Sequence, residues 1–356
     1  MNTDVMKSAV RAGRPMSRWH RVLAAVLRGF YFGRIPIVGA MAVPAAPRAG
    51  RLVVCSHRNG AIDGYQVLRA FPRVQFLVSV QLLRHPFLRL MFAGIPVVRA
   101  KDRARYGIES GDFGDPVQAG CAHLRAGGEL AIFPEGSSEW GSRPRRYQHG
   151  AARIARRLMD EGVDLEVVPA GLFYAHPDRF RSRAEVYVGA PVALPQQEGR
   201  SSREWERAIH DALASALDAV SVACRDQAHL EEVERQALAS AGRGGSYAEA
   251  FLRAQRETAP PVSPAAPPRR GSLPRTLGLA CMALLWPLLL AGWLAGRKAD
   301  GRNTVTFFRM AGGLAVGLVW VPCVAAAALA WPGQVVGMAL LAAFGWWLLG
   351  RGELRA

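Results

Sequence analysis

The chain has 356 residues, enough for one large domain or two smaller ones, with a formal net charge of +17 and a pI of about 10.8. A basic excess of this size suggests an anionic partner, such as nucleic acid, an anionic membrane surface or a phosphorylated substrate. The five cysteines are scattered without a C-x-x-C pair, which argues against a disulfide framework or a zinc site and fits a reducing cytoplasm.

A helical pattern begins at Ser17, and its apolar residues follow the spacing of one helix face: Trp19, Val22, Leu23, Val26, Leu27 and Phe30. Arginines lie on its other faces, and the segment is too short and too charged to span a bilayer. The pattern is typical of a helix lying in a membrane interface, and the alternative is a helix packed on the domain's own core. We therefore assign residues 1–50 to a basic N-terminal region that contains an interfacial amphipathic helix.

Short apolar strands alternate with helical segments through residues 51–225, after a possible edge strand within 35–43. The predicted strands are 51–55, 74–80, 95–98, 129–133, 165–173 and 184–189, and the predicted helices are 61–70, 85–93, 116–126, 149–161 and 203–223. This alternation predicts an α/β domain with a mainly parallel sheet flanked by helices.

The composition changes twice after this domain. Residues 226–257 predict a charged helical extension, and residues 258–274 are rich in proline and predict a stiff linker. Residues 275–350 then hold three apolar segments at 277–295, 310–331 and 333–349, which we predict to be membrane helices.

The basic residues around these apolar segments bear on their orientation. Three simple spans would place one basic cluster on the wrong side of the membrane. Pro287 lies midway through the first segment, where proline can break a helix. We therefore predict that 277–295 is re-entrant and that 310–331 and 333–349 form a hairpin of two spans. Both chain ends and the loop at 297–302 are then cytoplasmic.

The stretch from Ser56 to Gly64 holds the strongest chemical signal. His57 follows an apolar strand, and Asp63 lies in the first turn of the next helix, where a carboxylate faces the positive end of the helix dipole. Asn59 can cap this helix and Gly60 permits a sharp turn, so the Asp63 carboxylate could return to the His57 ring. That contact would fix the ring's tautomer and leave its second nitrogen free to take a proton.

Three further motifs follow in order, each at a predicted strand. Gly94 begins a short strand that ends on Arg99, and the segment from Phe133 to Ser138 carries a Pro-Glu-Gly turn. Val168-Pro169 lies in a third strand. Each motif is weak alone, but the four in this order are specific.

Over roughly residues 20–220 the sequence resembles the phospholipid/glycerol acyltransferases, which include glycerol-3-phosphate and lysophosphatidate acyltransferases. The matching positions are His57 with Asp63, Gly94 with Arg99, the segment from Phe133 to Gly136, and Val168-Pro169. The first motif here is H-x5-D, one residue longer than the commonest form, and Ser138 stands where the family usually has an arginine. Arg143, Arg145 or Arg146 could supply that cation.

The resemblance implies an O-acyltransferase that moves a fatty acyl group from an acyl thioester, acyl-CoA or acyl carrier protein, to a hydroxyl of a glycerol phosphate or lysophospholipid. His57 would be the base and Asp63 would orient it, while Arg99 would hold an acceptor phosphate. Glu135 would bind the acceptor's hydroxyls or anchor an arginine, and we also assign Gly94, Gly136, Ser137, Ser138, Arg143 and Pro169 to substrate binding. No cofactor or metal is expected, and no protein nucleophile is signalled.

Two other functions compete with this one. A thioesterase-like hydrolase would use water in place of the alcohol, and a membrane-anchored module could bind anionic lipid without catalysis. No nucleic-acid-binding motif accompanies the positive charge, so nucleic acid is not an expected partner. The partners expected are membrane lipids, the acyl thioester and the acceptor, with the catalytic domain of an integral membrane protein on the cytoplasmic face.

Overall fold

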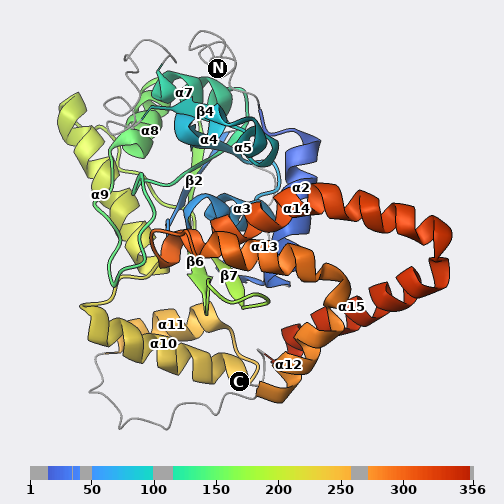
Figure 1. The fold of residues 1–356 in the computed structure, drawn as a ribbon. Helices are drawn as coiled ribbons and strands as arrows, with labels where there is room; N and C mark the ends of the chain where they lie inside the picture. Colours follow the sequence, from blue (N-terminus) through green and yellow to red (C-terminus); the bar gives the residue numbers. More distant parts are fainter. Residues whose placement is uncertain (1–14, 34, 41–49, 99–114, 258–271, 353–356) are drawn as a thin grey trace.

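The computed structural model describes residues 15–33, 35–40, 50–98, 115–257 and 272–352, and its centre is an α/β domain (Figure 1). In these residues seven strands form one sheet in the order β1-β7-β6-β2-β5-β3-β4. Every neighbouring pair is parallel except β6 with β7, which is antiparallel. The strands are β1 (Ile37–Gly39), β2 (Gly50–Cys55), β3 (Gln75–Ser79), β4 (Ile95–Val97), β5 (Glu129–Ile132), β6 (Leu165–Tyr174) and β7 (Ala184–Val188).

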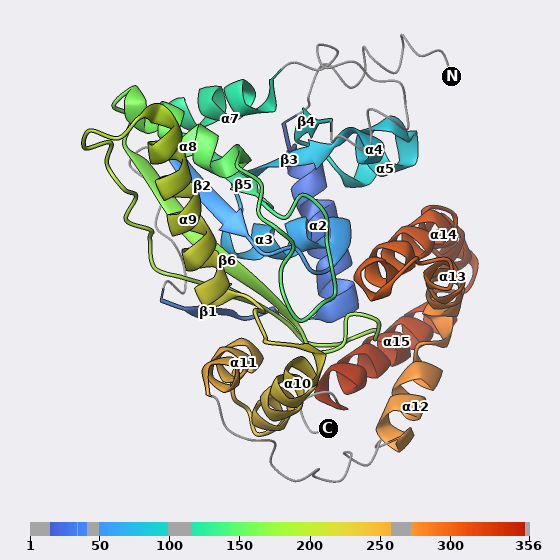
Figure 2. The same ribbon diagram turned by 90° about the vertical axis from the view of Figure 1, so that its left-hand side faces the viewer.

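Helices cover both faces of this sheet, as Figure 2 shows. One face packs against α2 (Arg18–Phe32) and α3 (Asp63–Ala70), and the other against α7 (Pro116–Arg125), α8 (Gly150–Asp160) and α9 (Ser202–Val220). Strand β2 is buried along its whole length because its residues alternate between the two cores: Val53 and Cys55 face α3, while Leu52 and Val54 face α8. The predicted fold class, a mainly parallel sheet flanked by helices, is confirmed.

The predicted strands match the observed ones to within one or two residues, and the predicted helix 85–93 is observed as α5 (Pro86–Met91). The helix before it, α4 (Val80–Arg84), was not predicted. The break between the two helices comes at His85, whose backbone is extended, because a residue before proline is disfavoured in the helical region.

Some apolar side chains of helix α2 are buried in the domain and others are exposed. Leu23, Tyr31 and Phe32 are buried against the core, whereas Trp19 and Val26 remain 52% and 60% exposed. The helix therefore packs on the domain's core, as the alternative expected, and also leaves an apolar stripe exposed, while its place in a membrane interface stays a prediction. Strand β1 also pairs with β7, so the sheet includes residues that precede the predicted domain start at 51.

The charged extension forms two helices, α10 (Gln227–Gly242) and α11 (Tyr247–Arg256). They share a small core of their own that includes Leu230, Val233 and Phe251, and this core packs against Phe173 of β6. The buried carboxylate of Glu185 in β7 accepts hydrogen bonds from the first amides of α11, which fixes α11 to the sheet.

The C-terminal region consists of α12 (Ser272–Cys281), the short 3₁₀ helix η2 (Ala283–Leu285), α13 (Trp286–Gly296), α14 (Arg302–Ala330) and α15 (Pro332–Gly352). Helices α14 and α15 are each long and apolar enough to cross a membrane. The segments Arg275–Cys281 and Ala283–Gly296 are bent by 69° at their junction, as a broken span or a re-entrant loop would be. In Figures 1 and 2, α13 lies along α14 and α12 along α15, so the bent pair follows the bend of the longer hairpin.

The sequence therefore predicted a bend in the first apolar segment and a hairpin of two long helices after it. The start of the hairpin was misplaced, because α14 begins at Arg302 and not at residue 310. The extra residues include the polar Asn303 and Arg309, which hydrogen-bond to the α/β domain and which hydropathy does not identify.

Candidate active site

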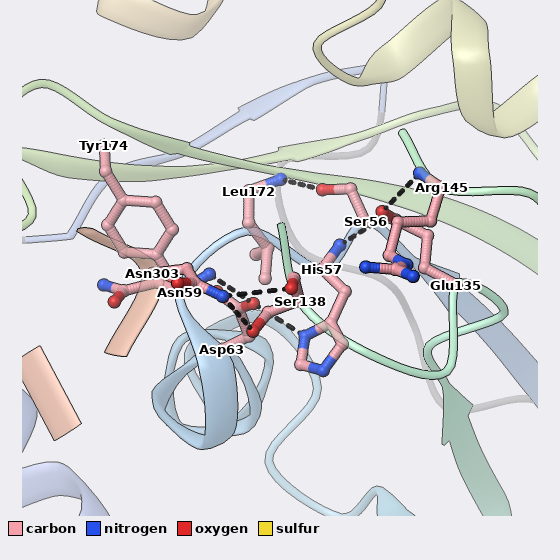
Figure 3. A network of polar contacts seen from close by, with 10 residues as sticks. All are labelled: Ser56, His57, Asn59, Asp63, Glu135, Ser138, Arg145, Leu172, Tyr174 and Asn303. Carbon is pink, nitrogen blue, oxygen red and sulfur yellow. Dashed lines mark hydrogen bonds and ion pairs between the residues drawn. The ribbon is translucent and has the colours of Figure 1, made fainter. Parts of the chain in front are cut away.

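The site lies where β2, β5 and β6 end at the same edge of the sheet (Figure 3). His57 follows β2, the segment from Phe133 to Ser138 follows β5, and Tyr174 ends β6. The carboxyl ends of parallel strands meet at one edge, so the fold brings these three segments together although they are far apart in the sequence.

The predicted pairing of His57 with Asp63 is confirmed. The His57 Nδ1 atom lies 2.9 Å from Asp63 Oδ2. Gly60, at φ +56°, opens the short helix η1 (Gly60–Ile62), and this turn delivers Asp63 as the first residue of α3. The side chain of Asn59 does not cap the helix as predicted; its main-chain N–H donates to Asp63 Oδ2 at 2.8 Å.

Asp63 is fully buried and its other oxygen also has a partner. The Tyr174 hydroxyl donates to Asp63 Oδ1 at 2.5 Å. Burial, and then the negative charge of Asp63, hold the pKa of the Tyr174 hydroxyl well above its ordinary value, so this hydroxyl remains a donor. A buried carboxylate needs such donors, and here three of them fix its orientation.

The His57 ring stacks on Phe133, with ring centroids 4.5 Å apart. Its side chain is 15% exposed, and no residue in the described part of the chain hydrogen-bonds to the second ring nitrogen, Nε2. If Nδ1–H donates to Asp63, Nε2 carries the lone pair and can accept a proton from a substrate.

The main chain of His57 is held at both polar atoms by the segment that follows β5. Its N–H donates to Glu135 Oε1 at 2.7 Å, and its carbonyl accepts from the Glu139 N–H at 3.1 Å. Glu135 Oε2 accepts from the Arg145 N–H at 3.0 Å. Glu135 therefore anchors an arginine, as one of its two predicted roles required, but through the main chain of that residue.

Burial raises the pKa of Glu135, and the two backbone N–H donors oppose this shift. Both carboxylate oxygens are occupied by main-chain donors, so the structure gives Glu135 the role of fixing the loop around His57.

The turn after β5 depends on Gly136, whose φ of +68° favours glycine and whose N–H donates to the Phe133 carbonyl at 3.0 Å. Ser137 continues the turn and is half-buried. Ser138, where the family resemblance leads one to expect an arginine, instead accepts two hydrogen bonds from the Asn303 side chain of α14, at its carbonyl and its hydroxyl (Figure 3).

Three other predicted site residues lie in different surroundings. Gly94 precedes β4 at φ +152°, and a Cβ there would be 2.5 Å from the Phe76 carbonyl oxygen, so glycine permits the close approach of the chain to β3. Pro169 is buried inside β6, where its carbonyl accepts from the Gly189 N–H. Arg143 is exposed and its Nε donates to the Cys224 carbonyl at 3.2 Å. Arg99 lies outside the described residues.

Comparison with known proteins gives three relevant results. No family model matches the sequence. Glycerol-3-phosphate O-acyltransferase 1 of Saccharomyces cerevisiae is 32% identical over 120 residues, which cover 32% of this chain and 16% of that protein. An uncharacterised acyltransferase of Schizosaccharomyces pombe is 32% identical over 110 residues, which cover 29% of this chain and 16% of that protein.

These similarities are consistent with the resemblance to the phospholipid/glycerol acyltransferases. The chain spans about a sixth of the length of these relatives. The solved structure of a 1-acyl-sn-glycerophosphate acyltransferase from Thermotoga maritima aligns with 56% of this chain and 77% of that chain, at a TM-score of 0.38 and 14% sequence identity.

The cysteine and serine side chains close to His57 are held in ways that do not suit a nucleophile. Cys55 is fully buried, and burial followed by the Asp63 charge raises the pKa of its thiol well above the ordinary value. The Ser56 hydroxyl accepts from the Leu172 N–H at 2.9 Å, and the Ser138 hydroxyl accepts from Asn303. Within the described residues no group of three or more His, Cys, Asp or Glu side chains is arranged as metal ligands would be.

Sequence reasoning missed Tyr174 and Asn303, and only one of them left a signal. Tyr174 is a polar residue at the end of a mostly apolar strand, and such strand ends carry functional side chains in α/β folds. Asn303 lies 165 residues from its partner and begins a helix that hydropathy identifies only by its apolar part.

Proposed function

We propose that this acyltransferase-family chain moves a fatty acyl group from an acyl thioester to a hydroxyl of a glycerol phosphate or lysophospholipid. The observation that carries the proposal is the His57 ring, which Asp63 holds at Nδ1 while Nε2 remains open. An open basic nitrogen without an adjacent protein nucleophile suits a reaction in which the substrate's own hydroxyl attacks.

The proposed reaction proceeds without a covalent acyl-enzyme. His57 Nε2 takes the proton of the acceptor hydroxyl as its oxygen attacks the thioester carbonyl, and the carbonyl π electrons move to the oxygen. The tetrahedral intermediate then expels the thiolate, which takes the proton from the imidazolium, so that an ester and a free thiol are formed. The buried Asp63 carboxylate stabilises the imidazolium, and such base catalysis contributes on the order of 10²–10⁴ in rate. The reaction needs no cofactor.

The acceptor and donor proposed are both anionic. The net charge of +17 favours anionic ligands, and the name of the Saccharomyces cerevisiae relative points to glycerol-3-phosphate as one acceptor class. We assign the acceptor phosphate to Arg99, whose guanidinium can make two parallel contacts to phosphate. Either acyl-CoA or acyl carrier protein fits the donor chemistry.

We further propose that the protein is integral to the membrane, with the α/β domain on the cytoplasmic face. Both ends of the α14–α15 hairpin contact that domain: Thr306 of α14 donates to the Pro177 carbonyl, and the Trp346 indole of α15 donates to the Phe30 carbonyl. The connection between α14 and α15 lies far from the sheet in Figure 1, which supports insertion of the hairpin with its connection pointing away from the domain.

The test is a transfer assay with the full chain in detergent or lipid bilayers. A labelled acyl thioester is offered with glycerol-3-phosphate, with lysophosphatidate, with other lysophospholipids, or with no acceptor. The proposal expects labelled ester with at least one acceptor and none with the His57→Ala variant. Labelled free fatty acid without ester would instead show a hydrolase, and binding of anionic vesicles without turnover would show a lipid-binding module.

A further inference from the structure

The first turn of α14 lies directly on the segments that form the site (Figure 3). The Asn303 side-chain amide donates to Ser138 at two atoms, its carbonyl at 3.0 Å and its hydroxyl at 2.9 Å. The Asn303 carbonyl oxygen lies against Gly60, where a Cβ would be 3.0 Å away from it. One residue of α14 therefore contacts both the loop after β5 and the turn before α3.

These two contact points are adjacent to the groups that hold the catalytic pair. Ser138 precedes Glu139, whose N–H donates to the His57 carbonyl, and follows Glu135, which accepts from the His57 N–H. Gly60 opens the turn that brings Asp63 to the ring. If Asn303 moved, its contacts would be lost both with the loop that hydrogen-bonds to the His57 main chain and with the turn that precedes Asp63.

Further contacts fix α14 in this position. The Arg302 guanidinium lies 4.6 Å from the centroid of the Trp140 ring, and the Arg58 guanidinium lies 4.5 Å from the same centroid. The Thr306 hydroxyl donates to the Pro177 carbonyl at 2.6 Å, and Met310 is buried in the main core. Helix α14 thus contacts the α/β domain through cation–π, hydrogen-bond and apolar contacts, and together these fix one position for the helix.

We propose that Asn303 is a positioning residue for His57, so that the catalytic centre is complete only when the C-terminal helix α14 is docked on it. The inference rests on the proposed function for the role of His57. Asn303 acts through Ser138 and Gly60 and does not contact the reacting atoms. Small displacements of a catalytic base are costly, because rate depends steeply on its distance and alignment to the reacting hydroxyl.

Asn303→Asp is the sharpest variant, because it keeps the shape of the side chain but removes both hydrogen-bond donors. Asn303 is the second residue of α14, where a carboxylate stabilises the helix start, so helix formation is maintained or strengthened. We expect kcat to fall roughly 10- to 100-fold, with the KM values for acceptor and thioester unchanged. Thr304→Ala is the matched control: it lies in the same turn, its hydroxyl donates to the Gly301 carbonyl, and kcat should stay within about 2-fold of the parent value.

Hydrogen–deuterium exchange of the full chain provides a readout that does not depend on the reaction. Asn303→Asp should speed exchange in peptides that cover 56–63 and 135–140, whereas Thr304→Ala should not. If the wild type shows no transfer activity but Asn303→Asp still exchanges faster, the result supports the positioning contact and refutes only the proposed function. Unchanged exchange and unchanged kcat in Asn303→Asp would overturn the inference, and so would a raised acceptor KM at constant kcat.

Discussion

Asp63→Asn separates the charge of the buried carboxylate from its hydrogen bonds. Asp63 Oδ2 accepts hydrogen bonds from the His57 ring and from the Asn59 main-chain N–H. The main-chain N–H can only donate. The amide oxygen of the new side chain must therefore occupy the Oδ2 position, and its NH₂ group then faces the Tyr174 hydroxyl, which can turn and accept. The variant keeps the orientation and the Nδ1 proton of the ring and loses only the negative charge.

The expected fall in kcat of Asp63→Asn follows from the loss of that negative charge. Two unit charges about 4 Å apart interact by about 4 kcal/mol at an effective dielectric constant of about 20, which sets an upper limit near 10³ in rate. Because the His57 side chain is 15% exposed, solvent screens part of this interaction, and we expect kcat to fall by roughly 10² with KM unchanged.

Steady-state kinetics of the full chain test this reasoning, with thermal unfolding as a control for folding. Asp63→Ala leaves the donors from His57, Asn59 and Tyr174 without an acceptor, so it should be more damaging than Asp63→Asn in both kcat and stability. Equal loss of kcat in the two Asp63 variants would refute the argument, because it would mean that the amide has turned over and forced the ring into the other tautomer.

Three further outcomes are expected. Tyr174→Phe removes one donor from the buried carboxylate and should lower the free energy of unfolding by about 1.5–3 kcal/mol, measured by denaturant titration; no change would show that the hydrogen bond is not formed. Arg99→Ala should raise the acceptor KM by roughly 10- to 150-fold, and Arg99→Lys should recover part of it; a rise in the thioester KM alone would move Arg99 to the donor site. Burial, then the charges of Arg179 and Arg302, lower the pKa of His176 to about 4. A histidine with a lowered pKa contributes stability that is fully present above about pH 6.5 and is lost as the pH falls toward 4. Between pH 7 and pH 4 the free energy of unfolding of the wild type should therefore fall by on the order of 1–2 kcal/mol more than that of His176→Gln, after allowance for solvent screening. Parallel pH dependence in the two proteins would contradict this.

Short-range patterns in the sequence were enough to predict most of the secondary structure and one catalytic pair. The strands and most helices follow from the period of apolar residues, which reports on the environment of neighbours in the chain. The pair of His57 and Asp63 was predictable for the same reason, since a spacing of six residues with a glycine turn allows the two side chains to meet. A break in the first apolar segment was predicted from Pro287, and the observed bend lies just before it, between Cys281 and Ala283. The two long helices after it followed from their hydropathy.

The tertiary structure alone decided which distant groups complete the site. Tyr174 lies 111 residues from the Asp63 carboxylate it contacts, and Asn303 lies 165 residues from Ser138. Glu135 was expected to bind the acceptor's hydroxyls or to anchor an arginine, and both its oxygens accept from main-chain amides, of His57 and Arg145, which carry no side-chain signature. Contacts of this kind depend on the strand order, which places the ends of β2, β5 and β6 at one edge, and on the docking of α14 there. Sequence periodicity cannot specify them, because it records whether a side chain is buried and not which distant residue it meets.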